Sequence, residues 1–291
     1  MKTLLCTSVA LVAFAMNSVL CRLALGKATI DAASFSTIRL VSGAVMLLLI
    51  LLVSKRARAS RPGMRWIPPV LLFLYAVAFA FAYMGLTAGT GALILFGSVQ
   101  ATMIITALCS GERPSSLEWA GLFVALSGLV YLVLPGLTSP SVPHSLLMML
   151  AGISWGFYSI LGRGSVNPLA ETTRNFVGAV PFAVAVTMLM SNQIHLSREG
   201  VLLAVVSGAV TSGLGYVVWY AALNGLTATR AATVQLAVPV LAAVGGVILL
   251  SESLTVRLLL AGSMILGGIG LALAGRARAV QIVGKEPEPV N

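Results

Sequence analysis

Long stretches of this sequence contain no Asp, Glu, Lys or Arg. They run 3–21, 40–54, 66–111, 119–162, 175–197, 200–229, 231–251 and 258–275. A helix needs about 20 apolar residues to cross the hydrocarbon of a bilayer, so the two longest stretches are each long enough to cross twice. Only 9% of the residues are charged and 58% are hydrophobic, whereas soluble domains carry roughly 25% charged residues. The chain is therefore expected to fold inside a membrane.

The lengths of these stretches predict ten transmembrane helices. Breaks within the two longest stretches are expected at 87–91 and at 135–144, where glycines and prolines interrupt the apolar pattern. The predicted helices are 3–22, 33–53, 67–87, 90–109, 117–134, 145–162, 172–190, 200–222, 230–250 and 257–275. β-Strands are not expected, because membrane-spanning strands alternate apolar and polar residues and these stretches do not. We therefore predict an all-α polytopic membrane protein.

Part of the first half of the sequence recurs in the second half. The segment Gly-Leu-Thr-Ala at 85–88 returns at 225–228, and at the same offset Glu112 falls on Glu252. Each half holds five predicted helices. Because five is an odd number, the second half enters the bilayer from the opposite side, and the two repeats are inverted. The expected organisation is a first five-helix repeat at 1–135, a second at 140–276 and a flexible cytoplasmic tail at 277–291.

The distribution of basic residues predicts the orientation of the chain. The net charge is +10, and with a cytoplasmic N-terminus twelve Lys and Arg residues lie on the inner side against four on the outer side. The four outer residues are Arg22, Lys27, Arg198 and Arg257. This asymmetry satisfies the positive-inside rule. We expect a multi-pass protein of a bacterial-type inner membrane with both termini in the cytoplasm, and no nucleic-acid partner.

A related motif closes each predicted repeat. Residues 111–115 read Gly-Glu-Arg-Pro-Ser and precede an apolar span that contains Gly128, and residues 251–255 read Ser-Glu-Ser-Leu-Thr and precede a span that contains Gly268. With ten spans in two inverted repeats, the region 3–275 resembles the drug/metabolite transporter superfamily, in particular its EamA-like members. It is most similar to the bacterial aromatic amino-acid exporters. The resemblance implies a central cavity lined by the first, third, fourth, sixth, eighth and ninth spans, with the fifth and tenth outside it.

The middle of every predicted span lacks charged residues. A cavity without a buried carboxylate or cation favours a neutral or zwitterionic substrate, and facilitated transport rather than proton coupling. Aromatic and amide side chains at mid-span are the remaining candidates for substrate binding, because rings stack on apolar groups and amides need a hydrogen-bond partner in hydrocarbon. They are Phe14, Asn17, Phe79, Tyr83, Gln100, Trp155, Tyr158, Trp219, Tyr220 and Gln235.

Four charged residues near predicted helix ends have two interpretations. Glu112, Glu252, Arg39 and Arg174 either reach water and backbone groups at the membrane surface or form ion pairs that gate the cavity. Three aromatic residues are expected to pack against neighbours or to anchor a helix at the membrane interface. They are Tyr75, Tyr216 and Trp66.

Together these features predict an exporter of amino acids with aromatic or other apolar side chains, or of similar small zwitterionic metabolites, that works by alternating access. Proton-coupled efflux of drugs or metabolites, or import, is the alternative. An intramembrane enzyme would need paired catalytic groups at depth, and the predicted spans contain no Asp and no His. No catalytic residue, metal site or cofactor is therefore expected. A non-transporting assembly partner is a further alternative. The expected partners are a small-molecule substrate and the lipid bilayer, and a monomer is the expected state.

Overall fold

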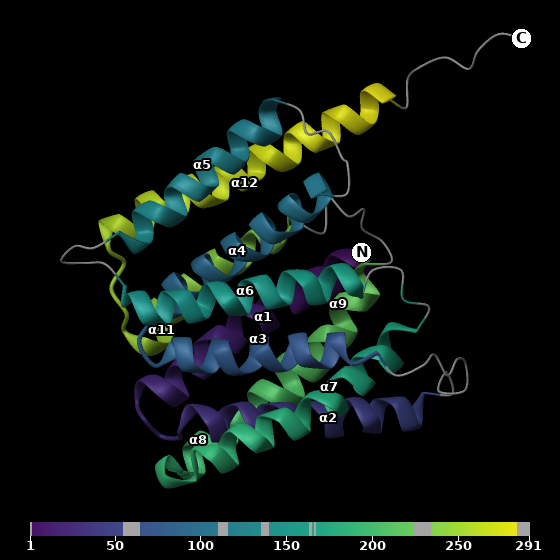
Figure 1. Cartoon of the computed structure of the whole chain (residues 1–291), viewed down its shortest axis with the longest axis vertical. Helices are drawn as coiled ribbons and strands as arrows, with labels where there is room; N and C mark the ends of the chain where they lie inside the picture. Colours follow the sequence, from purple (N-terminus) through teal and green to yellow (C-terminus); the bar gives the residue numbers. More distant parts are fainter. Residues whose placement is uncertain are drawn as a thin grey trace, which may run out of the picture.

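The computed structural model describes residues 2–54, 65–109, 116–134, 140–162, 165, 167–223 and 234–283. Helices run side by side through one bundle in this part of the chain (Figure 1), and no strand is formed there beyond one isolated bridge. The helices are α1 (Lys2–Gly26), α2 (Ala32–Val53), α3 (Ile67–Tyr83), α4 (Ala88–Cys109), α5 (Ser116–Val133), α6 (Val142–Leu161), α7 (Pro168–Leu189), α8 (Arg198–Val206), η3 (Ser207–Leu214), α9 (Gly215–Leu223), α11 (Ala237–Leu250) and α12 (Val256–Val283), with a short 3-10 turn η2 (Ser191–Gln193). Because α8, η3 and α9 form one continuous rod, the described residues contain ten long helical rods, each overlapping one expected span.

Local sequence signals set several of the helix starts. The side chain of Asp31 accepts a hydrogen bond from the backbone N–H of Ser34 at 2.8 Å and begins α2. The side chain of Asn167 accepts from the N–H of Ala170 at 3.2 Å and begins α7. α3, α6 and α7 also carry Pro in their first turn, where the missing N–H has no helical partner to lose.

Two helices extend beyond the expected spans. α1 continues to Gly26 rather than ending at 22, and α12 continues to Val283 rather than ending at 275. The first residues of the segment 277–291, which the sequence predicts as a tail, are therefore helical. Residues 277–281 read Ala-Arg-Ala-Val-Gln, and alanine, arginine and glutamine favour helix even outside an apolar environment.

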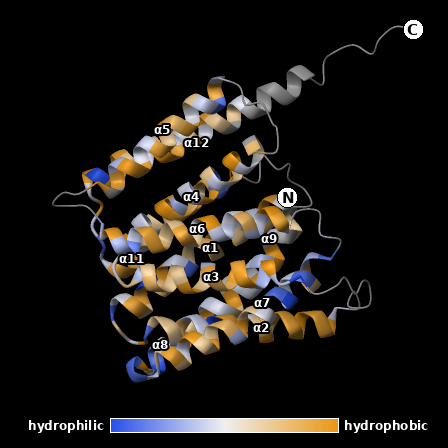
Figure 2. Cartoon of the chain, in the orientation of Figure 1, coloured by the Kyte–Doolittle hydropathy of each residue, from blue (hydrophilic) through white to orange (hydrophobic). Residues whose placement is uncertain are grey.

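The helices consist mostly of hydrophobic residues along their length (Figure 2). By length and composition, five of the described helices are able to cross a membrane, namely α1, α2, α4, α6 and the rod that joins α8 to α9. Large apolar side chains point outward, and Leu52, Val53 and Leu189 are 79%, 85% and 85% exposed. Extended apolar surfaces of this kind are unfavourable in water, so the bundle is built for a lipid environment.

The middle of the eighth rod is not an ordinary α-helix. η3 is π-helical from Ser207 to Leu214, and π-helical turns are rare and occur frequently at functional sites. Gly208 lies so close to α2 that a Cβ at this position would collide with Ser42 and with the backbone of Arg39. η3 also packs against α1. This close approach places the hydroxyl groups of η3 between α1 and α2.

α5 and α12 form a closely packed pair at one edge of the bundle (Figure 1). Gly121 of α5 and Gly268 of α12 face each other, and a Cβ on either would meet the backbone of the other. Small residues allow helices to approach in lipid, where apolar burial gives no drive for association. The fifth and tenth spans therefore lie at the periphery, where the resemblance places them.

In the predicted repeats, α1 corresponds to α6, α2 to α7, α3 to the rod that joins α8 to α9, α4 to α11 and α5 to α12. The helix contacts occur in matching pairs under this correspondence. α3 packs against α6 and α7, and the rod that joins α8 to α9 packs against α1 and α2. α4 packs against α6, and α11 packs against α1. The remaining large contacts, α2 with α7, α4 with α11 and α5 with α12, join each helix to its own counterpart. The division of the chain at 135 and 140 stays a prediction, because the segment 225–228 lies outside the described residues.

The packing of α5 on α12 predicts a position-specific effect of a single methyl group. We expect Gly268→Ala to lower the melting temperature of the detergent-solubilised protein by roughly 5 °C, because overpacking a close contact costs about 1–3 kcal/mol. Gly267→Ala is the matched control, since nothing lies within 4 Å of a Cβ at Gly267 and alanine favours helix. Scanning fluorimetry of both variants checks this. Equal losses of stability would contradict the packing of α12 described above.

Candidate functional site

Aromatic side chains from five helices meet at the centre of the bundle. The ring centroid of Trp155 in α6 lies 4.9 Å from that of Tyr75 in α3 and 5.1 Å from that of Tyr216 in α9. Phe14 of α1 and Phe176 of α7 pack edge-on against Tyr216 at 5.9 and 5.7 Å. Tilted ring pairs at about 4.5–7 Å are the favourable geometry. The rings therefore join these helices and surround whatever lies between them.

A narrow pocket lies among these rings. Its wall is built from α1, α3, α4, α6, η3 and α9, and it is lined by Phe14, Asn17, Ser18, Tyr75, Phe79, Leu95, Phe96, Trp155, Thr211, Ser212 and Tyr216. Its free space of about 20 Å³ has room for a water molecule and not for an amino acid. The first, third, fourth, sixth and eighth spans contribute to this wall, whereas the ninth span, α11, does not. A small molecule enters only when the rings move apart, so this conformation is closed.

One wall of the pocket is polar. Asn17 of α1 accepts a hydrogen bond on Oδ1 from the hydroxyl of Ser207 at 2.7 Å, and the hydroxyl of Thr211 lies 3.1 Å from the same oxygen. Both hydroxyls belong to η3. Among the described residues, the amide nitrogen of Asn17 has no acceptor, and it is left as a donor at the pocket wall. An amide at this depth needs partners because lipid supplies none, and η3 satisfies its oxygen.

A buried arginine lies behind the same wall. Arg39 is only 2% exposed, and its Nε donates to the hydroxyl of Ser212 at 3.1 Å while its Nη2 donates to the hydroxyl of Tyr75 at 3.1 Å. Its guanidinium carbon lies 5.2 Å from the ring centroid of Tyr75 and 5.0 Å from that of Phe79. Nη1 has no hydrogen-bond partner among the described residues. Arg39 thus neither reaches the membrane surface nor forms a gating ion pair, which were the two expectations for it.

The burial of Arg39 also corrects the expectation of a charge-free membrane interior. α2 begins at Ala32, so Arg39 lies two helical turns inside it, about 10 Å along the axis. The side chain then turns inward to the rings of α3 and the hydroxyl of Ser212 rather than toward a helix end. A positive charge is therefore available at the centre of the bundle.

An ion pair lies near one end of the pocket, one helical turn from the pocket-lining Ser18. Nε of Arg22, near the end of α1, lies 3.2 Å from Oε1 of Glu252, in the turn between α11 and α12. The other carboxylate oxygen of Glu252 accepts from the backbone N–H of Ala88 at the start of α4, at 2.8 Å. Nη1 of Arg22 donates to the carbonyl of Tyr83 at the end of α3, at 3.1 Å. This pair joins three pocket-lining helices, and it matches the ion-pair alternative for Glu252.

The turn that presents Glu252 has an unusual backbone. Ser251, at the end of α11, has φ 55° and ψ 32°, a left-handed conformation that a side chain other than glycine adopts at a cost. The N–H of Glu252 donates to the carbonyl of Gly246 at 3.1 Å, which fixes the direction of the turn. The carboxylate is thereby directed back to the start of α4.

Arg174 has an acidic partner on its own helix. Arg174 lies 4.0 Å from Glu171, one turn away on α7, and both side chains are well exposed at 44% and 38%. Exposed pairs of this kind contribute little to stability. Glu112 lies outside the described residues.

Seven of the predicted binding residues lie in or beside the central pocket. Phe14, Asn17, Phe79 and Trp155 line it. The other three contact residues of this wall without lining it. Tyr158 stacks on Trp155 at 5.4 Å, Trp219 packs edge-on against Phe14 at 5.8 Å, and Tyr83 packs edge-on against Phe79 at 4.7 Å.

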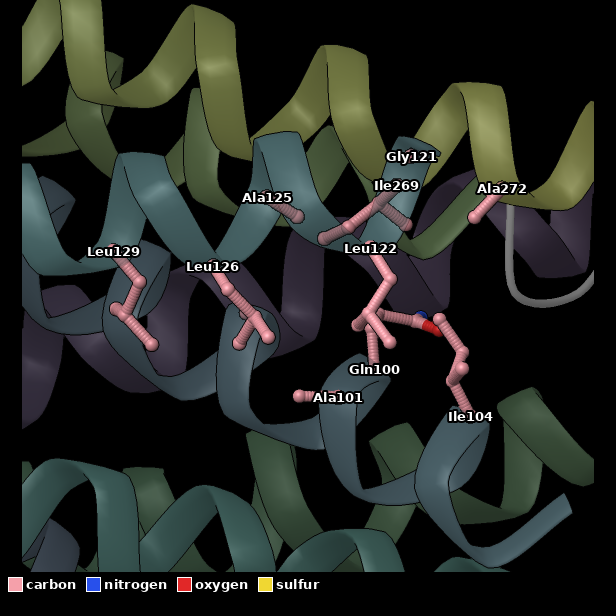
Figure 3. A pocket seen from close by; sticks show the side chains of 11 residues that line it. Gln100, Ala101, Ile104, Gly121, Leu122, Ala125, Leu126, Leu129, Ile269 and Ala272 are labelled. Carbon is pink, nitrogen blue, oxygen red and sulfur yellow. The ribbon is translucent and has the colours of Figure 1, made fainter. Parts of the chain in front are cut away.

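Gln100 lies in a different place from the one that the sequence suggested. It points into a second pocket, between α4 and the α5–α12 pair (Figure 3). The side chain is 3% exposed, and its neighbours there are apolar, among them Leu122, Ala125 and Ile269. It makes no hydrogen bond to the described residues. Gln100 therefore does not take part in the central pocket.

Two further predicted residues are not found in the central wall. Gln235 is partly exposed, just before α11, and lines neither pocket. The side chain of Tyr220 lies outside the described part of the structure. Their assignment as binding residues stays a prediction.

Sequence reasoning missed the hydroxyl-bearing residues of the pocket wall. Tyr75 and Tyr216, expected to pack or to anchor at the interface, line the pocket, and Thr211 and Ser212 were not singled out. One signal was present, since the eighth span carries Ser207, Thr211 and Ser212 among several glycines in an otherwise apolar stretch. Hydroxyl groups and glycines together mark places where helices meet closely in lipid.

Comparison with known proteins places the chain among transporters. Residues 143–274 match the EamA-like transporter family. An uncharacterized protein of Pseudomonas aeruginosa is 49% identical over 276 residues, which cover 94% of this chain and 96% of that protein. A Salmonella typhimurium protein named as a probable amino-acid metabolite efflux pump is 25% identical over 218 residues, or 69% of this chain and 72% of that protein. One solved crystal structure superposes with a TM-score of 0.64 at 18% identity, over 93% of this chain and 98% of that one, and shows a shared fold alone.

The ion pair at the pocket end predicts a change in accessibility when its charge is removed. In a protein whose three native cysteines are replaced, a probe introduced as Ser18→Cys lies in the pocket wall, one turn before Arg22. We expect Glu252→Gln to speed labelling of this cysteine by a membrane-impermeant thiol reagent several-fold, because α1, α3 and α4 lose their common anchor. Glu171→Gln removes a carboxylate of an exposed pair and should leave the rate unchanged. Equal rates in all three proteins would show that the pair does not hold the pocket closed.

Proposed function

The chain belongs to the EamA-like transporter family, and we propose that it exports amino acids with aromatic or other apolar side chains, or similar small zwitterionic metabolites. The substrate passes through the central pocket by alternating access. The observation that carries this proposal is the composition of the pocket wall, which combines six aromatic residues with one amide and three serine or threonine hydroxyls. Binding sites for small molecules combine a mostly apolar lining with a few placed polar groups in this way.

The pocket chemistry supports an amphipathic substrate. Tyr75, Trp155 and Tyr216 present ring faces and edges that stack on an aromatic or aliphatic side chain. Asn17 and Ser212 supply polar groups to the same pocket, and the charged end of an amino acid would lie near them. The names of the Salmonella typhimurium relative and of a similar Escherichia coli protein, both probable amino-acid metabolite efflux pumps, favour the same substrate class.

The closed state supports transport by alternating access. Substrate cannot occupy the pocket until the rings separate, and the Arg22–Glu252 pair closes the end of the bundle where α1 and α3 end and α4 begins. By the charge asymmetry of the sequence, this end faces outward and both termini lie in the cytoplasm of a bacterial-type cell. In Figure 1, the start of α1 and the last turns of α12 lie on the opposite side of the bundle, at the right of the view. No Asp or Glu occurs at mid-depth of the predicted spans, which favours facilitated export over proton coupling.

Counterflow in proteoliposomes tests the proposed substrate class. Vesicles with the purified protein and unlabelled phenylalanine inside should take up labelled phenylalanine faster than empty vesicles. Trp155→Ala should reduce this rate at least tenfold, because it removes the ring shared by Tyr75 and Tyr216. Trp119→Ala is the control, since Trp119 lies on α5 and is 53% exposed. No acceleration over empty vesicles with any aromatic or aliphatic amino acid would mean that the substrate class is wrong.

A further inference from the structure

No acidic side chain in the described part of the protein neutralises the charge of Arg39. A guanidinium stays protonated in proteins and carries five N–H donors, and a buried charge is costly in a membrane interior unless an opposite charge meets it. Here the partners are neutral, namely the hydroxyls of Ser212 and Tyr75 and the rings of Tyr75 and Phe79. The ion pairs found among the described residues join other arginines to Glu252 and Glu171. The site therefore lacks an anion.

The groups that hold Arg39 are also groups that line the pocket. Tyr75, Phe79 and Ser212 contact the guanidinium and form part of the pocket wall. The guanidinium thus lies one side chain away from the space that the substrate would enter, and its unpartnered Nη1 is the donor that remains to be satisfied. We infer that Arg39 binds the carboxylate of the transported molecule when the rings of α3 move aside.

This inference rests on the proposed function and names the group of the substrate that the protein recognises. A carboxylate is the planar anion that a guanidinium binds best, through charge-assisted and often paired hydrogen bonds. Asn17 adds an amide donor on the same wall. In contrast, none of the described pocket-lining residues is Asp or Glu, so an ammonium group finds only ring faces and neutral oxygens there. Carboxylate is therefore the required group, and the amino group is dispensable.

The recognised class is accordingly small monocarboxylates with an aromatic or apolar body, of which amino acids are one kind. Because Arg39 belongs to α2, the bound carboxylate would lie on the α2 side of the pocket. The apolar body of the ligand would then lie among Tyr75, Trp155 and Tyr216. An aromatic amine or amide keeps the apolar body and loses the group that Arg39 binds.

Binding of three related ligands to the purified full-length protein tests this. L-Phenylalanine, 3-phenylpropanoate and L-phenylalaninamide share a benzyl group and differ in the carboxylate and the amine. Dissociation constants come from the ligand dependence of the melting temperature. We expect the two acids to bind within about tenfold of each other and the amide to bind about 10–100-fold more weakly. Binding of the amide as tight as that of phenylalanine overturns the inference.

Variants of Arg39 give the second arm of the test. Arg39→Gln should weaken both acids about 10–100-fold and leave the amide unchanged, and Arg39→Lys should restore part of the loss because it keeps the charge without the paired donors. Arg174→Gln, on the exposed face of α7, is the matched control and should bind as the unchanged protein does. If Arg39→Gln does not fold, the comparison of acids and amide on the unchanged protein decides alone.

The outcomes separate this inference from the proposed function. Counterflow of phenylalanine together with equal binding of acid and amide overturns the carboxylate site and leaves the transporter proposal standing. Absence of both counterflow and binding for all three ligands overturns both. Loss of acid binding in Arg174→Gln equal to that in Arg39→Gln also contradicts the site, because a surface charge would then have the same effect.

Discussion

Lipid offers no hydrogen-bond partner, so a polar side chain at membrane depth is stable only where other helices supply one. In this chain, hydroxyl groups of the π-helical η3 are hydrogen-bond partners of buried polar side chains. Ser207 and Thr211 meet Asn17 of α1, and Ser212 meets Arg39 of α2. Hydroxyl groups, rather than opposite charges, thus join three helices at the centre of the bundle. The position of the pocket follows from these contacts, since Thr211 and Ser212 form part of its polar wall.

The two arginines near the pocket differ in how their charge is met. Arg22 has a carboxylate partner in Glu252, and that pair also binds backbone groups at the ends of α3 and α4. Arg39 has neutral partners only among the described residues. Under the proposed function, the Arg22–Glu252 pair stabilises the closed end of the bundle, and Arg39 is available to bind an anionic group of the substrate. α1 and α3 contribute to the wall of the central pocket and also to the contacts of the Arg22–Glu252 pair. Binding of a charged substrate at the centre is thereby connected to closure at the end of the bundle.

The sequence predicted the parts of the fold that depend on hydropathy. Charge-free stretches located the helices, and the family resemblance placed the fifth and tenth spans at the periphery, where Gly121 and Gly268 pack α5 against α12. Aromatic and amide residues at mid-span included Phe14 and Trp155, which do line the central pocket. These features are local, so a single sequence carries them.

The rotation of each helix about its axis was not predictable in the same way. Helices of this bundle are apolar on all sides, so no polar stripe indicates which face turns inward. Gln100 was expected at the central cavity for its depth alone, and its face of α4 turns instead to the α5–α12 pair. Arg39 was assigned to a helix end because a charge in lipid is costly, and the close approach of Gly208 to α2 supplies the interior partner that sequence reasoning could not foresee. The π-helical turn that creates this approach has no sequence signature of its own.

A structure of the protein with a bound aromatic amino acid tests the central claim most directly. The account predicts a ligand ring among Tyr75, Trp155 and Tyr216, with a carboxylate oxygen within hydrogen-bond distance of Nη1 of Arg39. A ligand bound beside Gln100, or one in the central pocket whose carboxylate points away from Arg39, would contradict it.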